Sequence, residues 1–187
     1  MQTSAESVYT LEDRTGHNTC SDFDDIYDRL YLRVARLPQR TTTMIYQMRH
    51  RSSRHRDSMP FSAEPIVILD FASDESLGNI SFTKAQITIP MSRYLRKTSL
   101  FGGSLSRKFT ASDGREYTWN RGTVQGQEWS CTTAENYLVA HYDLKPPHQR
   151  AYGVSGNTLK IYQPFFPIAV EIIASLTIMR HIAQFNL

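Results

Sequence analysis

Residues 164–185, which read PFFPIAVEIIASLTIMRHIAQF, decide the fold of this 187-residue chain. Pro167 suits the first turn of a helix, because the N–H that proline lacks would have no helical partner there. At about 100° per residue, aliphatic side chains cover every side of a helix over 167–184. A helix that is apolar all round is buried, either in a membrane or inside a protein.

A membrane span is the first alternative for this helix. Spanning helices need roughly 20 apolar residues. Here the apolar run 165–179 contains Glu171 and is followed by Arg180 and His181. A carboxylate in the middle of a membrane is costly. We therefore predict the buried core helix of a soluble domain without a transmembrane span, and a C-terminal membrane anchor is the alternative.

Ahead of the helix, short β-branched and aromatic runs alternate with turn residues about every ten residues, which is typical of a barrel or sandwich. Asp113-Gly114, between two alternating segments, is a strong hairpin signal. We predict a mainly β fold, a closed antiparallel β-barrel of about 11–12 strands around the hydrophobic C-terminal helix. The predicted strands include 27–34, 41–48, 65–71, 79–82, 86–89, 106–111, 116–120, 128–132, 137–142 and 158–163.

Charge is unevenly distributed along the chain. The net charge is −6 over residues 1–28, +9 over 29–108 and zero over 109–187, which gives +3 in total. The first residues are polar and lack periodicity, so we predict a flexible acidic arm over 1–26 and a single domain over 27–187. The acidic arm can fold back on the basic half or can keep the chain soluble, and we favour the second interpretation.

Composition excludes several functional classes. Two cysteines provide neither a disulfide framework nor a four-cysteine zinc site, and the six histidines lack ligand spacing, so no metal or cofactor is predicted. The N-terminus does not read as a secretory signal. We therefore predict a cytoplasmic protein, with a peripheral position at membranes as a further option. Nothing in the sequence indicates the oligomeric state.

Residues 107–119, RKFTASDGREYTW, carry a family resemblance. They resemble the R-x-F-T-x-x-D-G-x-x-Y-x-W block of an uncharacterised domain family abundant in mushroom-forming fungi. Residues 136–142 and 158–161 and the final helix follow in the same order, so the resemblance covers roughly 27–184. It implies the Tubby C-terminal-like fold, a barrel of about twelve strands around a hydrophobic helix. Phospholipid scramblases and LURP-one-related proteins share this fold, but no catalytic or ligand residue transfers from the resemblance.

Two basic clusters are the best functional lead. We expect an anion-binding surface made of Arg49, Arg51, Arg54, Arg56, Arg93, Arg96 and Lys97. Arginine forks match phosphate geometry, and clustered basic residues attract a protein to anionic membranes. By analogy with phosphoinositide binders on the Tubby-like fold, the expected function is a binding module for phospholipid head groups or another phosphorylated ligand. Nucleic acid is not favoured, because no aromatic residue is interleaved with the bases of 49–56.

An enzyme is the alternative, although no catalytic residue is favoured. A cofactor-free cyclase or isomerase of apolar metabolites needs little more than a shaped cavity and one acid, and the candidates are Glu171, His141 and Asp143. Glu171 in the first helical turn also has a structural interpretation, favoured by the helix dipole. A cavity beside the helix would favour the enzyme. A third alternative is an interaction or self-assembly domain using Phe165, Phe166 or residues 185–187.

Overall fold

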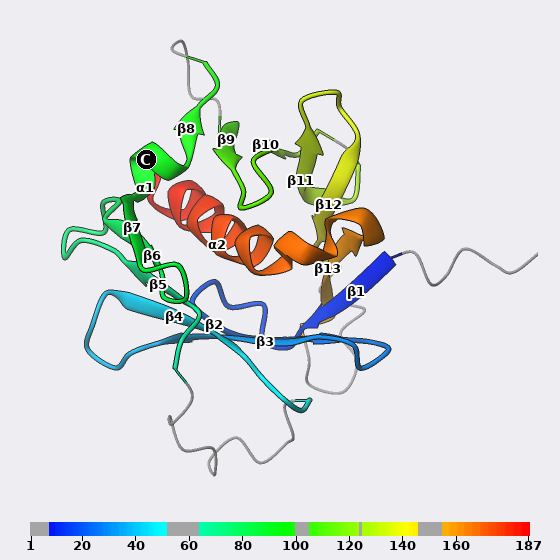
Figure 1. Cartoon of the computed structure of the whole chain (residues 1–187), viewed down its shortest axis with the longest axis horizontal. Helices are drawn as coiled ribbons and strands as arrows, with labels where there is room; N and C mark the ends of the chain where they lie inside the picture. Colours follow the sequence, from blue (N-terminus) through cyan, green and yellow to red (C-terminus); the bar gives the residue numbers. More distant parts are fainter. Residues whose placement is uncertain (1–7, 52–63, 100–104, 124, 146–154) are drawn as a thin grey trace, which may run out of the picture.

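Thirteen strands form one antiparallel sheet in the part of the chain that the computed structural model describes, residues 8–51, 64–99, 105–123, 125–145 and 155–187 (Figure 1). In spatial order these are β7 (Ile87–Pro90), β6 (Asn79–Phe82), β5 (Val67–Asp70), β4 (Thr42–Gln47), β3 (Tyr31–Arg36), β2 (Cys20–Asp25), β1 (Val8–Asp13), β13 (Asn157–Tyr162), β12 (Leu138–Asp143), β11 (Gln127–Thr133), β10 (Glu116–Arg121), β9 (Arg107–Thr110) and β8 (Arg96–Lys97). Consecutive strands pair with each other, except β7 with β8, and β1 also pairs with β13.

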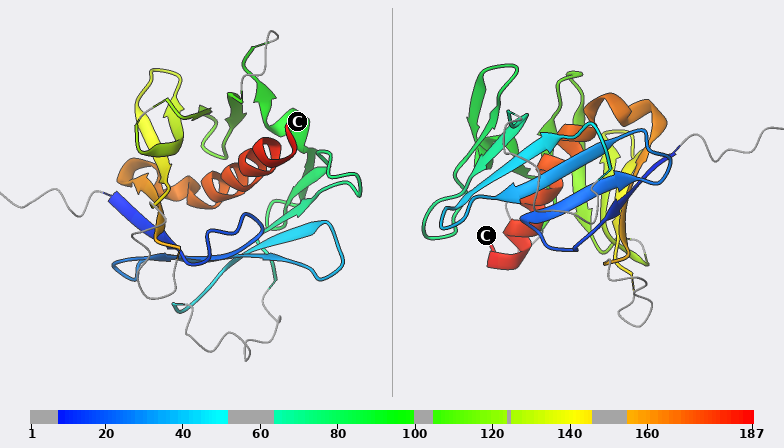
Figure 2. Two further views of the ribbon diagram at one scale, coloured as in Figure 1. Left: turned by 180° about the vertical axis from the view of Figure 1, so that it is seen from behind. Right: turned by 90° about the horizontal axis from the view of Figure 1, so that it is seen from below.

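The C-terminal helix lies inside the curl of this sheet. The chain passes from β13 through a 3-10 segment, Gln163–Ile168, into α2 (Ala169–Phe185), and strands lie on several sides of α2 (Figures 1 and 2). Eleven of its seventeen residues are buried. The indole of Trp119 donates a 2.8 Å hydrogen bond to the hydroxyl of Ser175 inside the core. The buried helix predicted at 167–184 is therefore confirmed, with its α-helical part beginning at Ala169.

Barrel closure is not detected among the described residues. Strands β7 and β8 are the two edges of the sheet, and the short helix α1 (Met91–Tyr94) connects them. Because β8 has only two residues, it offers little backbone for pairing with β7. The prediction of a mainly β fold with a buried apolar helix is confirmed, but the predicted closure into a barrel is not detected. Helix α1 and strand β8 were not predicted.

The predicted arm over residues 1–26 is wrong for residues 8–25. These residues form β1 and β2, which lie in the middle of the sheet. The acidic side chains of β2 are buried under arginines: Asp22 pairs with Arg33 at 2.6 Å and Asp24 with Arg14 at 2.9 Å. Acidic and basic segments thus fold against each other, which corrects the favoured solubility interpretation. The strand expected at 27–34 begins only at Tyr31, after a turn.

The hairpin predicted around Asp113-Gly114 is confirmed. Strands β9 and β10 pair across a turn in which Gly114 has φ +79°, a conformation that favours glycine. Phe109, Tyr117 and Trp119, the aromatics of the resemblance block, are fully buried in the core. Their role is therefore packing, as cross-strand aromatic pairs commonly provide.

Candidate functional site

A pocket of about 350 Å³ lies between the two edges of the sheet, beside the first turn of α2. One wall comes from the β6–β7 hairpin, and the opposite wall comes from the end of β9 and the turn that follows it. The lining is mainly apolar, and exposed hairpin residues at the rim open it to the surface. Its residues are Gln47, Ile66, Phe82, Lys84, Ala85, Ile87, Ile89, Tyr94, Thr110, Ala111, Ser112, Val170 and Glu171.

Glu171 places a carboxylate in this apolar pocket. Its Oε1 accepts a 2.6 Å hydrogen bond from the backbone N–H of Ser112, and its Oε2 accepts a 3.0 Å bond from the Ser112 hydroxyl. Burial raises the pKa of Glu171 above its usual 4.5, although the two bonds from Ser112 oppose that shift. An ionised carboxylate has about four lone-pair sites, so acceptor capacity remains for a ligand.

Tyr94 lines the pocket with its aromatic ring. The ring packs against Phe82 and Phe109, with centroids 5.7 Å and 5.6 Å away. The residue is only 6% exposed, and its buried hydroxyl has no hydrogen-bond partner among the described residues. Burial and the nearby charge of Glu171 raise the pKa of Tyr94 well above 10, so the hydroxyl stays protonated. Because the hydroxyl is buried, Glu171 is the polar group that the pocket offers beside this ring.

Sequence reasoning flagged Glu171 but missed Tyr94 and Ser112. Glu171 stood out as a lone acid on an apolar helix, whereas Tyr94 lies among basic residues and Ser112 in a hairpin turn. No periodicity connects these three positions. They meet only because α1 and the β9–β10 turn both approach the first turn of α2.

The predicted anion-binding residues that the structure describes lie in two places, Arg49 and Arg51 after β4, and Arg93, Arg96 and Lys97 on α1 and β8. Arg51 pairs with Asp28 at 2.7 Å and with Glu12 at 3.4 Å, and Arg96 pairs with Glu116 at 2.8 Å. Arg54 and Arg56 lie outside the described residues. Arg49, next to β4, and Arg93 and Lys97, on α1 and β8, are exposed, as is the paired Arg96.

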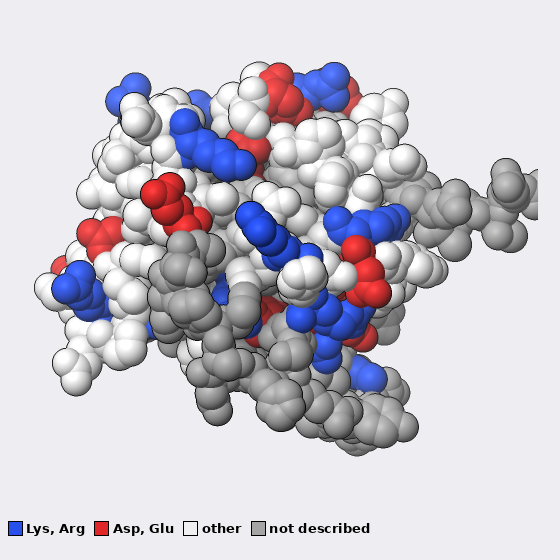
Figure 3. Space-filling view, turned by 60° about the horizontal axis from the view of Figure 1, so that its bottom comes forward, with Lys and Arg blue, Asp and Glu red and all other residues white. Residues whose placement is uncertain are grey.

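Strands β4 and β8 lie on opposite sides of α2 in Figure 1. On the lower face of the molecule, Figure 3 shows acidic and basic side chains interspersed, without a continuous basic surface among the residues it describes. The described part of that face thus carries charges of both signs.

His141 and Asp143 lie on β12, away from the pocket lining. The His141 Nδ1 atom is 2.8 Å from an Asp143 carboxylate oxygen, and the other carboxylate oxygen lies 3.6 Å from the Lys160 ammonium. The histidine is buried and its pair with Asp143 is formed as expected from their spacing. The structure does not bring this pair together with Glu171.

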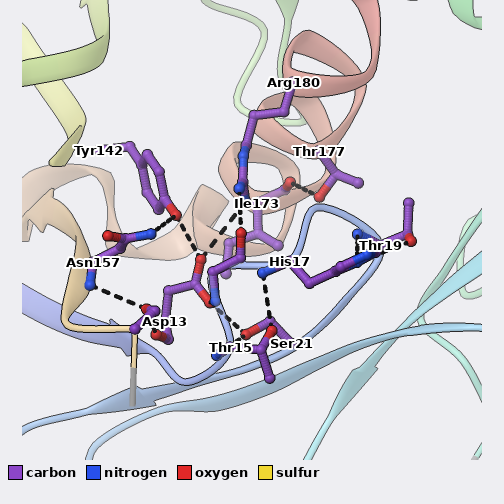
Figure 4. Close-up of polar contacts among 12 residues, drawn as sticks. Asp13, Thr15, His17, Thr19, Ser21, Tyr142, Asn157, Ile173, Thr177 and Arg180 are labelled. Carbon is purple, nitrogen blue, oxygen red and sulfur yellow. Dashed lines mark hydrogen bonds and ion pairs between the residues drawn. The ribbon is translucent and has the colours of Figure 1, made fainter. Parts of the chain in front are cut away.

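A buried polar cluster near the other end of α2 is built from Asp13, Tyr142, Arg180 and their neighbours (Figure 4). The Asp13 carboxylate accepts hydrogen bonds from the Gly16 N–H, the Ser21 hydroxyl and the Tyr142 hydroxyl. Arg180 donates to the Gly16 carbonyl and lies 3.6 Å from Asp13. Because its members are mutually bonded, this cluster fixes α2 to the sheet and offers little to a ligand.

The aromatic residues considered for self-assembly mostly serve the interior. Phe166 stacks on Tyr9 with centroids 4.1 Å apart, and Phe165 packs edge-on against Tyr117. Phe185 remains 37% exposed and contacts His181. Two of the three side chains are thus engaged within the fold.

Two further properties concern metals and membranes. Within the described ranges, no group of three or more His, Cys, Asp or Glu residues could hold a metal ion. One helical segment, Gln163–Phe185, is long and apolar enough to cross a membrane, and 72% of its most apolar window is buried inside the protein. This burial agrees with the core-helix interpretation of that segment.

These features define a mainly β protein whose single curled sheet surrounds a buried C-terminal helix and leaves an apolar pocket between its edges. The chain belongs to the family of unknown function DUF6593, whose family pattern matches residues 9–184. The match begins within β1, so the family pattern includes the strands that the sequence prediction had assigned to an arm. No curated protein matches the chain, and no solved structure does.

Proposed function

We propose that the protein binds a small, mainly apolar compound that carries an oxygen function, in the pocket between the sheet edges. The observation that carries this proposal is the pairing of an apolar cavity of about 350 Å³ with one carboxylate, that of Glu171. Binding pockets for small molecules are commonly about 300–1,000 Å³, apolar, and equipped with few polar groups that orient the ligand.

The carboxylate and the walls of the pocket define the ligand chemistry. Ionised Glu171 can accept a hydrogen bond from a hydroxyl group. The aliphatic and aromatic walls exclude a strongly hydrated ligand, because desolvating such groups is unfavourable. An apolar alcohol satisfies both requirements.

The experiment compares two substitutions on neighbouring residues of β7. Ile87 lines the pocket and is 49% exposed, so Ile87→Asp should fold while placing a charge at the pocket rim. Thr88→Asp is the matched control, since adjacent residues of a strand point to opposite faces. We expect trans-2-decalol, monitored by saturation-transfer NMR, to bind the wild type and Thr88→Asp but to bind Ile87→Asp at least tenfold more weakly. Equal binding by all three proteins would contradict the proposal.

A second candidate function is recognition of anionic phospholipid head groups at a membrane surface. We infer a Tubby-like relationship for the fold, supported by the curled sheet around a buried apolar helix and by the resemblance of residues 107–119. The exposed side chains of Arg93 and Lys97, close in sequence to Tyr94, favour such a surface near the pocket. Basic residues near anionic membranes contribute about 1 kcal/mol each.

Co-sedimentation with phosphatidylserine vesicles tests this second function. The double variant Arg93→Gln/Lys97→Gln should sediment less than the wild type, and binding should weaken as salt increases. Arg40→Gln, which changes an exposed arginine outside the predicted clusters, is the control. Vesicle binding that neither the double variant nor salt reduces would contradict head-group recognition by these residues.

A further inference from the structure

The Glu171 carboxylate has acceptor capacity that the described protein groups do not use. Each of its oxygens accepts one hydrogen bond from Ser112, at 2.6 Å from the backbone N–H and at 3.0 Å from the hydroxyl. Since a carboxylate has about four lone-pair sites, about one site stays free on each oxygen. Both bonds to Ser112 are exposed to solvent and Glu171 lines the pocket, so a ligand can reach these sites.

No basic residue that the structure describes neutralises this carboxylate. Glu171 forms no ion pair with these residues, and the neighbouring charge that acts on it, that of Asp113, is also negative. Lys84 lines the pocket, but it is exposed in the turn between β6 and β7, where solvent screens its charge. The pocket therefore presents a half-buried negative charge that a ligand can compensate.

We propose that the pocket selects an apolar amino alcohol, in which an ammonium and a hydroxyl group on neighbouring carbon atoms each donate a hydrogen bond to one oxygen of Glu171. This inference rests on the proposed binding function and adds the ammonium group to the ligand. A hydroxyl group alone fills one free site and leaves the negative charge in place, whereas an ammonium group neutralises it. Two donors side by side match two carboxylate oxygens, as the paired N–H groups of arginine do.

The position of Glu171 limits the cost of taking up the ammonium group. An ammonium group is strongly hydrated, and burying it completely is unfavourable even beside a carboxylate. Because the bonds between Glu171 and Ser112 are exposed to solvent, an ammonium group there keeps part of its water, while the hydrocarbon body of the ligand contacts Phe82 and Ile89 on the apolar lining. An apolar carboxylate is disfavoured in the same position, since Glu171 would repel its charge.

Three probes on one ring system test the proposal by saturation-transfer NMR. The alcohol trans-2-decalol carries the hydroxyl group alone, trans-2-decalylamine carries the ammonium group alone, and 3-amino-trans-2-decalol carries both on neighbouring carbon atoms. At about pH 8 the two amines are protonated, as lysine is. We expect the wild type to bind the amino alcohol about tenfold more tightly than the alcohol, because hydrogen bonds between charged groups are about twice as strong as neutral ones. The amine alone should bind more weakly than the amino alcohol.

Glu171→Gln removes the charge of the side chain and nearly keeps its shape. Its amide group can still bond to Ser112, so this variant should bind the alcohol and the amino alcohol about equally. Glu135→Gln, which removes an exposed carboxylate outside the pocket lining, is the matched control and should keep the full preference. In the wild type the preference should disappear as pH falls through the pKa of Glu171, which burial raises above 4.5, because the protonated carboxyl group no longer attracts the ammonium group.

The outcomes separate this inference from the binding function. The absence of trans-2-decalol binding to the wild type would overturn both proposals. Binding of trans-2-decalol without a preference for the amino alcohol would overturn the inference and leave the binding function intact. A preference that persists in Glu171→Gln and at low pH would overturn the role of Glu171. Equal binding of the amine and the amino alcohol would overturn the role of the hydroxyl group.

Discussion

Replacing Asp13 with asparagine tests how α2 is fixed within the sheet. Asp13 is 1% exposed, and its carboxylate accepts from Gly16 at 2.8 Å, from Tyr142 at 2.6 Å and from Ser21. An asparagine in either orientation turns its N–H₂ group toward a donor. The change also removes the negative charge 3.6 Å from Arg180. Asp13→Asn therefore leaves a buried cation and at least one buried donor without a partner.

The cost follows from burial. Breaking a buried ion pair commonly costs about 3–5 kcal/mol, because the remaining charge stays buried and unpaired. The 3.6 Å separation and the 13% exposure of the Arg180 side chain place Asp13 at the lower end, about 3 kcal/mol. At about 2–4 °C per kcal/mol for a chain of this size, Tm should fall by about 6–12 °C.

Asp28→Asn is the matched control, because it makes the same chemical change at an exposed ion pair. Asp28 lies 2.7 Å from Arg51 and its side chain is 62% exposed, so solvent screens the pair and the loss of stability should be far smaller than for Asp13→Asn. Urea unfolding monitored by fluorescence of the two tryptophans, Trp119 and Trp129, reports the whole core because both are fully buried. Equal loss of stability in the two variants would refute the assignment of Asp13 as an anchor of α2.

Three further predictions concern stability. Burial raises the pKa of Glu171 above 4.5, so the free energy of unfolding of the wild type should fall as pH rises through that shifted pKa. Glu171→Gln should lack this fall in urea titrations between about pH 4 and pH 7.5. Burial lowers the pKa of His181 below 6.5, so the stability contributed by its neutral form should be lost as pH falls through the lowered pKa. In the same titration, the free energy of unfolding of His181→Gln should depend less on pH in this acidic range. A Cβ on Gly78 would lie 2.0 Å from the carbonyl oxygen of Asp70, so Gly78→Ala should lose about 2 kcal/mol or more, and a wild-type urea midpoint would contradict this.

The parts of the fold that could be predicted are those that a local sequence pattern specifies. The all-round apolar pattern of α2 specifies burial whatever surrounds it, and Asp-Gly with alternating flanks specifies the β9–β10 hairpin. Strand β2 lacks such a signal, since its sequence CSDFDD has low β propensity. Its acidic residues are stable in a strand only because Arg14 and Arg33 neutralise them, and this pairing appears only in three dimensions.

The candidate site divides in the same way. Glu171 could be predicted, because a carboxylate interrupts an apolar helix and therefore needs a partner or a function. Tyr94 could not, since its importance depends on burial against Phe82 and Phe109 from different hairpins. The partners of the basic residues were not predictable either. Sequence proximity indicated the clusters but not that Arg51 pairs with Asp28 or that Arg96 pairs with Glu116.

The opening in the sheet and the pocket have one structural cause. The chain leaves β7 through the four residues of α1 and re-enters the sheet as β8, which is two residues long. A longer β8 could pair with β7 and would bring backbone across the gap where Ile87, Ile89 and Tyr94 now line the cavity. Among the described residues, no pairing of β7 with β8 is therefore detected at the point where Glu171 begins the central helix. In this fold the buried helix provides stability, and the unclosed edge gives a ligand access to its first turn.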